Sequence, residues 1–256
     1  MRSEYHADMN TSSLPIVTGQ QMAAVDKAMA EVCGLDLMQV MEVAGRAVAI
    51  VARHWWRRSV AKGTVTILCG SGGNGGDGFV CGRYLLGWGI PVELWPLHTS
   101  AEMRGLAAHQ LAVCHKIGMT VIEPGRTPSF DNASLVLDGL FGFGLSAAPT
   151  GRAAELIRAA NASPAPILAI DIPSGIDATT GHAYHPAVRA DSTVTLGLPK
   201  QGLLQGSGVT HTGTVVVADI GIPAAAYRVV GIPPTTAFQT AAFTDLAGRP
   251  VWPELL

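Results

Sequence analysis

The sequence predicts an α/β fold: a Rossmann-like three-layer sandwich with a mostly parallel, doubly wound sheet and two extra N-terminal helices. Three observations predict it. Apolar segments of strand length alternate with amphipathic segments of helix length. The segments at 135–137 and 167–170 are continuous apolar runs, typical of parallel strands that are covered on both faces. A glycine-rich run at 70–78 separates the first strand pattern from the helix pattern that follows it.

Capping signals predict where the two N-terminal helices begin. Thr18 and Gln21 have capping-box spacing, and Asp36 is placed to cap a second helix. Apolar residues recur at helical spacing behind both caps, as Met22, Val25, Met29 and Val32 and then as Met38, Met41, Ala44, Val48, Val51 and Trp55. This methionine-rich stripe is typical of a packed core.

Strand and helix patterns alternate beyond residue 63. Strands are expected at 64–69, 91–95, 134–138, 166–171, 192–198 and 214–220, with a weaker one near 120–123. Helices are expected at 77–88, 101–117 and 151–161. The chain is expected to divide into a flexible leader (1–17), one main domain (18–223) and a C-terminal tail or linker (224–256).

Composition limits the classes of partner. The chain has 256 residues, of which 48% are hydrophobic and 14% charged, and its net charge is −2. This charge favours neither nucleic acid nor an anionic membrane as a partner. The sequence contains no apolar run long enough for a membrane span, and the N-terminus has no apolar signal region. The four cysteines have no metal-binding spacing, so we expect reduced thiols and a cytoplasmic location.

The glycine run predicts a phosphate-binding loop. Six of its nine residues are glycine, which lets the backbone approach a ligand closely and adopt positive φ angles. The free N–H groups at the start of the following helix attract anions. Asn74 and Asp77 lie within the run; both residue types also favour tight turns, and Asp77 is a candidate N-cap of the helix.

Further polar residues follow other predicted strands. Asp138 and Asp171 each end a strand and precede a glycine-bearing loop, and Lys200 follows a later strand. Because ligands of doubly wound sheets bind beyond the carboxyl ends of the strands, these residues are candidate functional groups. The alternatives are that the two acids cap the segments after them and that Lys200 is a solvated loop residue.

Ordered motifs resemble the NAD(P)H-hydrate epimerase family, also called the YjeF N-terminal domain. The resemblance covers about residues 16–223, and D-I-P-S-G-x-D at 171–177 matches fully. The other matching segments are 40–49, 70–78, 137–146, 190–200 and 219–223. Gly73, Val43 and Phe143 depart from the family pattern, in which Asn, Asn and Thr are common at these positions.

The resemblance implies an isomerase that interconverts the R and S forms of NADHX and NADPHX, cofactors hydrated at C6 of the nicotinamide ring. It implies a bound potassium ion held by Asn74, Asp138 and Ser174. It also implies substrate contacts from Gly73, Asn74, Gly75, Gly76, Asp77, Gly142, Phe143, Gly144, Leu145, Ser146, Ala147, Ala148 and Asp171. Epimerisation requires proton transfer at oxygen, so we expect Asp171 to be the general acid/base.

The resemblance further implies a homodimer, and a partnership or fusion with an NAD(P)HX dehydratase. Two other functions fit the sequence. One is a catalytically weak nucleotide-binding or scaffold module on the same fold. The other is an NAD-dependent dehydrogenase, because Gly70, Gly72 and Gly75 satisfy G-x-G-x-x-G and Glu93 lies near the expected ribose-binding position.

Overall fold

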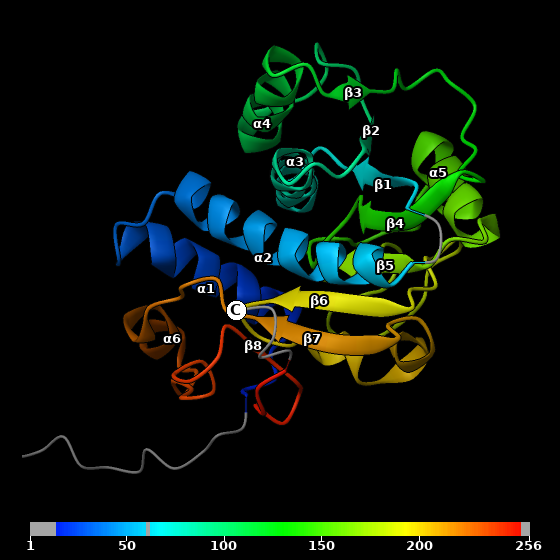
Figure 1. The fold of residues 1–256 in the computed structure, drawn as a ribbon. Helices are drawn as coiled ribbons and strands as arrows, with labels where there is room; N and C mark the ends of the chain where they lie inside the picture. Colours follow the sequence, from blue (N-terminus) through cyan, green and yellow to red (C-terminus); the bar gives the residue numbers. More distant parts are fainter. Residues whose placement is uncertain (1–13, 60–61, 252–256) are drawn as a thin grey trace, which may run out of the picture.

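The computed structural model describes residues 14–59 and 62–251 (Figure 1). Eight strands form one sheet in the order β3–β2–β1–β4–β5–β6–β7–β8. They are β1 (Thr64–Cys69), β2 (Val92–Pro96), β3 (Thr120–Val121), β4 (Ala133–Gly139), β5 (Ile167–Ile170), β6 (Ser192–Leu196), β7 (Thr214–Ala218) and β8 (Phe243–Thr244). All neighbouring strands are parallel except β7 and β8. The predicted doubly wound sheet is confirmed, and its order reverses between β1 and β4.

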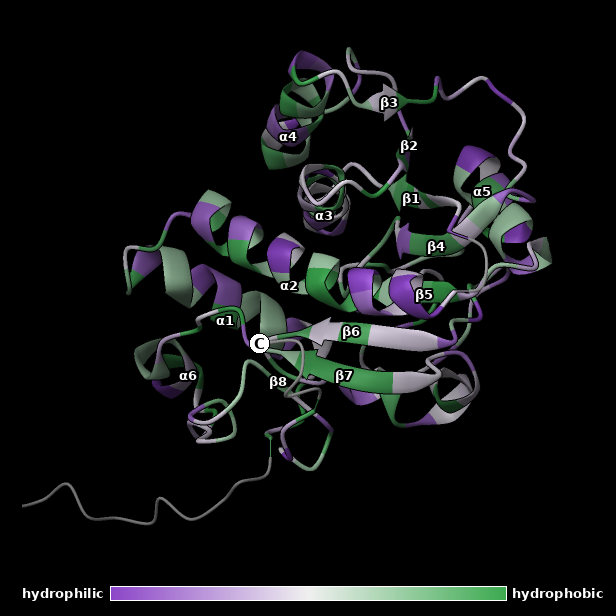
Figure 2. Cartoon of the chain, viewed as in Figure 1, coloured by the Kyte–Doolittle hydropathy of each residue, from purple (hydrophilic) through white to green (hydrophobic). Residues whose placement is uncertain are grey.

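Helices cover both faces of this sheet. They are α1 (Gly19–Glu31), α2 (Leu37–Arg58), α3 (Gly73–Gly87), α4 (Gly105–Lys116), α5 (Gly151–Ala162) and α6 (Ala224–Val230). In β4, Leu135 and Leu137 pack into the core shared with α2, α3 and α4, whereas Val136 packs into the core shared with α5. This alternation makes the three layers, and Figure 2 shows the hydrophobic strand segments between the helices.

Both N-terminal helices begin where the capping signals predict. Thr18 forms a capping box with Gln21, and Asp36 forms one with Gln39. Of the predicted leader, residues 1–13 lie outside the described part of the chain. Leu14 and Val17 are buried. Val17 forms a parallel bridge with Lys200, in which its N–H donates to Pro199 and its carbonyl accepts from Gln201.

Helix α3 corrects the prediction for the glycine run. The helix begins at Gly73 and not at residue 77, its N-cap is Gly72, and Asp77 therefore lies inside the helix and does not cap it. No glycine of the run has positive φ. Close packing explains the glycines instead: a Cβ atom on Gly70 would lie 1.8 Å from the Leu140 carbonyl oxygen, and one on Gly75 would lie 1.9 Å from the Gly70 carbonyl oxygen.

The segment predicted to be a tail or linker contains regular structure. Residues 224–230 form α6, which packs against α1, with Tyr227 4% exposed. Strand β8 pairs antiparallel with β7 at the edge of the sheet. Residues 252–256 lie outside the described part, and the predicted domain boundaries stay a prediction.

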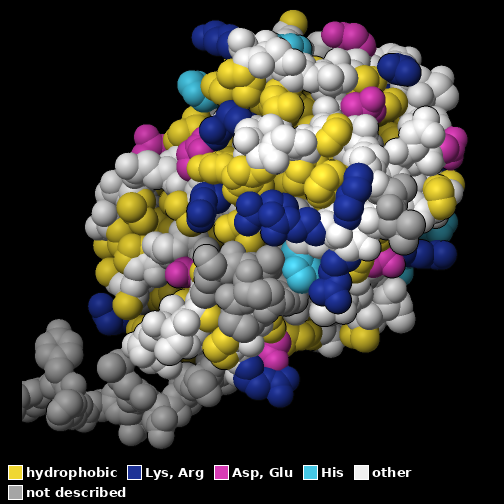
Figure 3. Space-filling model, in the orientation of Figure 1, with side chains coloured by type: hydrophobic (Ala, Val, Ile, Leu, Met, Phe, Trp, Pro, Cys, Tyr) yellow, Lys and Arg dark blue, Asp and Glu magenta, His cyan; other side chains and the backbone are white. Residues whose placement is uncertain are grey.

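The outer face of α2 is basic. Arg46, Arg57 and Arg58 are exposed, and Figure 3 shows dark blue side chains gathered over this helix. Partial burial and the neighbouring charges of Arg57 and Arg46 lower the pKa of Arg53. In the described residues, all four cysteines are free thiols. No described helix combines the length and apolarity that crossing a membrane requires.

Candidate active site

A cleft of about 840 Å³ opens at the carboxyl edge of the sheet, where the strand order reverses. The start of α3 and the loop after β4 form one side of it, and α1 and α2 contribute an apolar wall that includes Met22, Met29 and Met41. Ligands of doubly wound sheets bind at this position, and the volume is typical of a small-molecule site.

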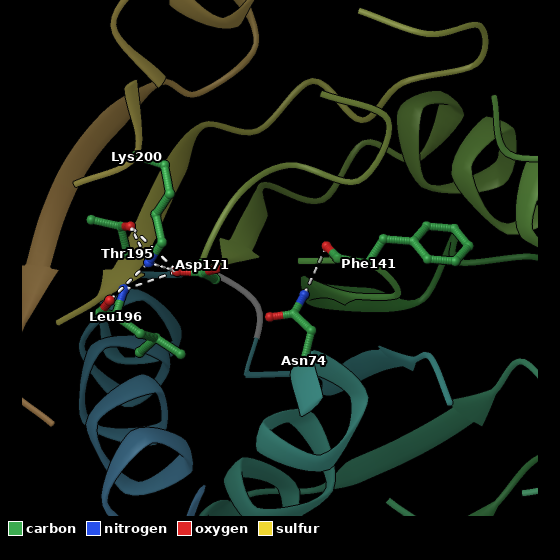
Figure 4. Close-up of polar contacts among 6 residues, drawn as sticks. All are labelled: Asn74, Phe141, Asp171, Thr195, Leu196 and Lys200. Carbon is green, nitrogen blue, oxygen red and sulfur yellow. Dashed lines mark hydrogen bonds and ion pairs between the residues drawn. The ribbon is translucent and has the colours of Figure 1, made fainter. Parts of the chain in front are cut away.

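Lys200 and Asp171 form a buried ion pair beside the cleft. Lys200 is 1% and Asp171 4% exposed. The Lys200 Nζ atom donates to Oδ1 of Asp171 and, at 2.8 Å, to the carbonyl of Leu196 (Figure 4). The N–H of Leu196 also donates to Asp171 Oδ1, at 3.2 Å. Lys200 is therefore part of the site and not a solvated loop residue.

The same contacts leave the other oxygen of Asp171 available. Oδ2 accepts no hydrogen bond from the described residues, and a Cβ atom built on Gly142 would lie 3.5 Å from it. Asp171 has φ 67°, a left-handed conformation that costs energy for a residue other than glycine. The backbone turn after β5 thus aims a carboxylate with one occupied and one free oxygen at the cleft.

Asn74, Asp138 and Ser174 come together although they lie far apart in sequence. The Ser174 hydroxyl donates to Asp138 Oδ1 at 2.6 Å, and the Ser174 N–H donates to Oδ2 at 2.7 Å. The Phe141 N–H donates to the Ser174 hydroxyl, and its carbonyl accepts from Asn74 Nδ2; both distances are 2.9 Å. Asn74 Oδ1 is buried with no hydrogen-bond partner.

This cluster has the donor set of a hard monovalent cation. Its oxygen atoms belong to an amide, a carboxylate and a hydroxyl group, which suit alkali and alkaline-earth ions better than soft metals, and Asn74 Oδ1 is the one without a hydrogen-bond partner among them. Burial raises the pKa of Asp138 to about 6 against the opposing hydrogen bonds from Ser174, so the carboxylate lacks a compensating charge. A buried oxygen without a partner beside a buried carboxylate fits a bound potassium ion. The described residues contain no cluster of three His, Cys, Asp or Glu side chains for a transition metal.

The loop after β4 lines the cleft over its whole predicted length, from Gly142 to Ala148. Phe143 is half-buried, and its ring centre lies 5.9 Å from Lys200 Nζ. The aromatic ring that departs from the family pattern therefore lines the cleft near the ammonium group of Lys200.

The glycine run divides into two groups. Gly73, Asn74 and Asp77 line the cleft, whereas Gly75 and Gly76 are buried within the packing of the helix and do not line it. Burial raises the pKa of Asp77 well above its usual range, and the nearby Asp171 and Asp26 raise it further while Lys200 lowers it.

Sequence reasoning missed Asp26, whose side chain lies on the inward face of α1 and lines the cleft. Its spacing in the sequence could have revealed it. Asp26 stands four residues after Met22 and three before Met29, so its side chain lies on the same helix face as these apolar residues. The strand and helix pattern alone did not reveal that α1 forms a wall of the site.

Comparisons with known proteins agree with this architecture. Residues 37–202 match the family described as YjeF-related protein N-terminus. An NAD(P)H-hydrate epimerase of Dehalogenimonas lykanthroporepellens is 36% identical over 84% of this chain and 86% of its own length. A bifunctional NAD(P)H-hydrate repair enzyme of Moorella thermoacetica is 36% identical over 81% of this chain, which covers 41% of that larger protein.

A solved structure shows the same fold. The crystal structure of the yeast protein ynu0 superposes with a TM-score of 0.74 at 25% identity, over 91% of this chain and all of the yeast chain. The family match covers more than half of the sequence, and the full-length relatives exceed 30% identity. The chain therefore belongs to the family of the YjeF-related protein N-terminus.

Proposed function

We propose that this chain is an NAD(P)H-hydrate epimerase that interconverts the R and S forms of NADHX and NADPHX. The observation that carries the proposal is the Lys200–Asp171 pair, in which one carboxylate oxygen is fixed and the other faces a cleft at the nucleotide-binding edge of the sheet. Relatives that align over most of the chain carry the epimerase name.

Asp171 is the proposed general acid/base. Inversion at C6 requires the hydroxyl group to leave and return, or the ring to open and reclose, and both routes transfer a proton at oxygen. Lys200 and the Leu196 N–H hold Oδ1, so Oδ2 is the oxygen that exchanges the proton. Binding energy from the rest of the cofactor holds the ring against this oxygen.

The pyrophosphate is proposed to lie at the start of α3. Gly72 provides no side-chain cap, so the first N–H groups of the helix are free to bind an anion. Gly73, Asn74, Asp77 and the loop from Gly142 to Ala148 are the proposed substrate contacts on the cleft wall. Gly75 and Gly76 contribute by allowing the close packing that positions this turn.

Asn74, Asp138 and Ser174 are the proposed potassium ligands. A bound ion would supply positive charge at the strand ends, next to the site of the substrate phosphates. Gly142 connects this cluster to the proposed catalytic residue, because a Cβ atom there would lie 3.5 Å from both Asn74 and Asp171 Oδ2.

The deciding experiment incubates the purified protein with R-NADPHX and follows the appearance of the S form, with and without potassium. We expect acceleration over the spontaneous rate. A rate equal to the spontaneous one would favour the nucleotide-binding or scaffold module, and hydride transfer on a panel of alcohols and acids would favour the dehydrogenase.

Cellular partners follow from the same proposal. The Moorella relative is a bifunctional repair enzyme, so we propose that this chain acts with, or is fused to, an NAD(P)HX dehydratase. A homodimer and a cytoplasmic location are further proposals, which sedimentation analysis and cell fractionation would test.

A further inference from the structure

Asp26 is an acidic side chain in an apolar wall. Met22, Val25 and Met29 are 2%, 0% and 0% exposed on the same helix, and Met22 and Met29 line the cleft together with Asp26. The Asp26 carboxyl forms no hydrogen bond with the described residues. A carboxyl group without a hydrogen-bond partner beside two thioethers is costly to ionise, so it keeps its proton to a higher pH. Residues that transfer protons in active sites often have this property.

The charges around Asp26 come from three other elements. Lys200 follows β6, Asp171 follows β5, and Asp77 lies in α3. Burial raises the pKa of Asp26 to about 6, Lys200 opposes this shift and Asp171 adds to it. The carboxyl groups of Asp26, Asp77 and Asp171 thus all lie near the single buried ammonium group of Lys200. That group donates a hydrogen bond to Asp171.

Epimerisation at C6 by loss and return of the hydroxyl needs proton transfer on both faces of the nicotinamide ring, and a single carboxyl group reaches only one face well. In this route the hydroxyl leaves one face of C6 and returns to the other, so protons must be given and taken on both faces of the ring. Asp171 reaches the cleft from the end of a strand, and Asp26 reaches it from a separate helix. Two acid–base groups on separate elements can serve the two faces.

We propose that Asp26 is a second catalytic residue, which exchanges a proton with the C6 oxygen on the face opposite to Asp171. This inference rests on the epimerase function proposed above. In one direction, the Asp26 carboxyl gives its proton to the C6 hydroxyl. The C6–O bond breaks with its electron pair, water leaves, and the N1 lone pair forms an iminium bond to C6.

Water then adds to the opposite face of C6. The iminium electron pair returns to N1, and the proton released by the water passes to the Asp171 carboxylate. The reverse direction starts from protonated Asp171 and ends with protonated Asp26. Atoms and charge balance, and exchange with solvent restores the starting proton distribution.

The test compares Asp26→Asn with Glu31→Gln, which also removes an acidic group from α1 but at an exposed position paired with Lys27. We expect Asp26→Asn to lower kcat at least about 100-fold with KM within about threefold, and Glu31→Gln to match the wild type. The melting temperature should not fall in Asp26→Asn. A kcat within about threefold of the wild type, or a loss confined to KM, would overturn the role of Asp26.

The wild-type pH profile is a second readout that depends on no variant. We expect kcat/KM to fall as the pH rises through about 6 and Asp26 loses its proton, and this step to vanish in Asp26→Asn. The profile must be the same in both directions, because the equilibrium constant between the epimers does not depend on pH. A flat wild-type profile from pH 5 to pH 8 would refute the proposal. A wild-type protein without activity would refute the epimerase function, whereas full activity in Asp26→Asn refutes only this inference.

Discussion

The Lys200 ammonium group donates to Oδ1 of Asp171 inside the protein, and the two residues lie 29 positions apart in the sequence. Burial of both groups makes the pair expensive to break, since either partner alone would be an uncompensated buried charge. The pair therefore fixes the carboxylate in one orientation and ties the ends of β5 and β6 together.

Asp171→Asn should abolish epimerisation and leave cofactor binding within about threefold of the wild type. Asparagine tolerates the left-handed conformation at φ 67°, so the backbone should be kept, but an amide cannot exchange the proton. Turnover of R-NADPHX and titration with NADP⁺ would measure the two effects. Asp131→Asn, at an exposed site, is the control, and near-normal turnover in Asp171→Asn would contradict the assignment.

Lys200→Met should destabilise the protein by about 3–5 kcal/mol, because it leaves the Asp171 carboxylate buried without its partner. The double variant Lys200→Met, Asp171→Asn should recover part of this loss. Urea unfolding of the wild type, the two single variants and the double variant gives the coupling energy between Lys200 and Asp171 directly. Additive losses would mean that the two side chains do not depend on one another.

Asp26→Asn should change stability in a pH-dependent way. The pKa of Asp26 is raised in the folded protein, from 3.8 to about 6, so the folded state binds the proton more tightly than the unfolded state. The wild type therefore loses stability relative to Asp26→Asn as the pH rises from 4 through 6. The variant should be more stable by about 1–3 kcal/mol at pH 7.5 and nearly equal at pH 4. Unfolding curves that keep a constant difference across this range would contradict the shifted pKa.

Potassium should stabilise the wild type against unfolding by about 2.7 kcal/mol at 100 times its Kd. The orphaned Oδ1 of Asn74 would gain a partner on binding, so Asn74→Ala should lose most of this increment. Thermal unfolding in potassium chloride and in choline chloride at equal ionic strength separates binding from screening. Equal melting temperatures in the two salts would argue against a cation site in the wild type.

Two glycines of the same turn should respond differently to substitution. A Cβ atom at Gly73 meets no atom within 4 Å, so Gly73→Asn, which installs the residue common in the family, should alter stability by less than about 1 kcal/mol. Gly75→Ala should cost more than about 3 kcal/mol, because its Cβ atom would overlap the Gly70 carbonyl. Denaturant unfolding of both variants checks the contrast, which equal losses would refute.

The sequence predicts β1 to β7 and the starts of α1 and α2 well, because continuous apolar runs and helix caps are local signals, but it does not predict β8. The helix pattern predicts a start at residue 77, whereas α3 begins at Gly73, because packing against α2 and the sheet holds these glycines in a helix although glycine is a poor helix former. The burial of Lys200 was not readable, since it depends on a partner 29 residues away. Asp26 was missed for the same reason: only the tertiary position of α1 turns its inward face toward the cleft.

The bridge between Val17 and Lys200 has a consequence for how this protein can be divided. The family region matched in the sequence starts at residue 37, so it contains the glycine turn and the aspartates but neither Val17 nor α1. A protein trimmed to residues 37–202 would keep the glycine turn, Asp138 and Asp171, but it would lose the α1 wall of the cleft and the hydrogen bonds between Val17 and the Lys200 segment. The part of the chain that lines the candidate site is therefore longer than the part that the family model matches.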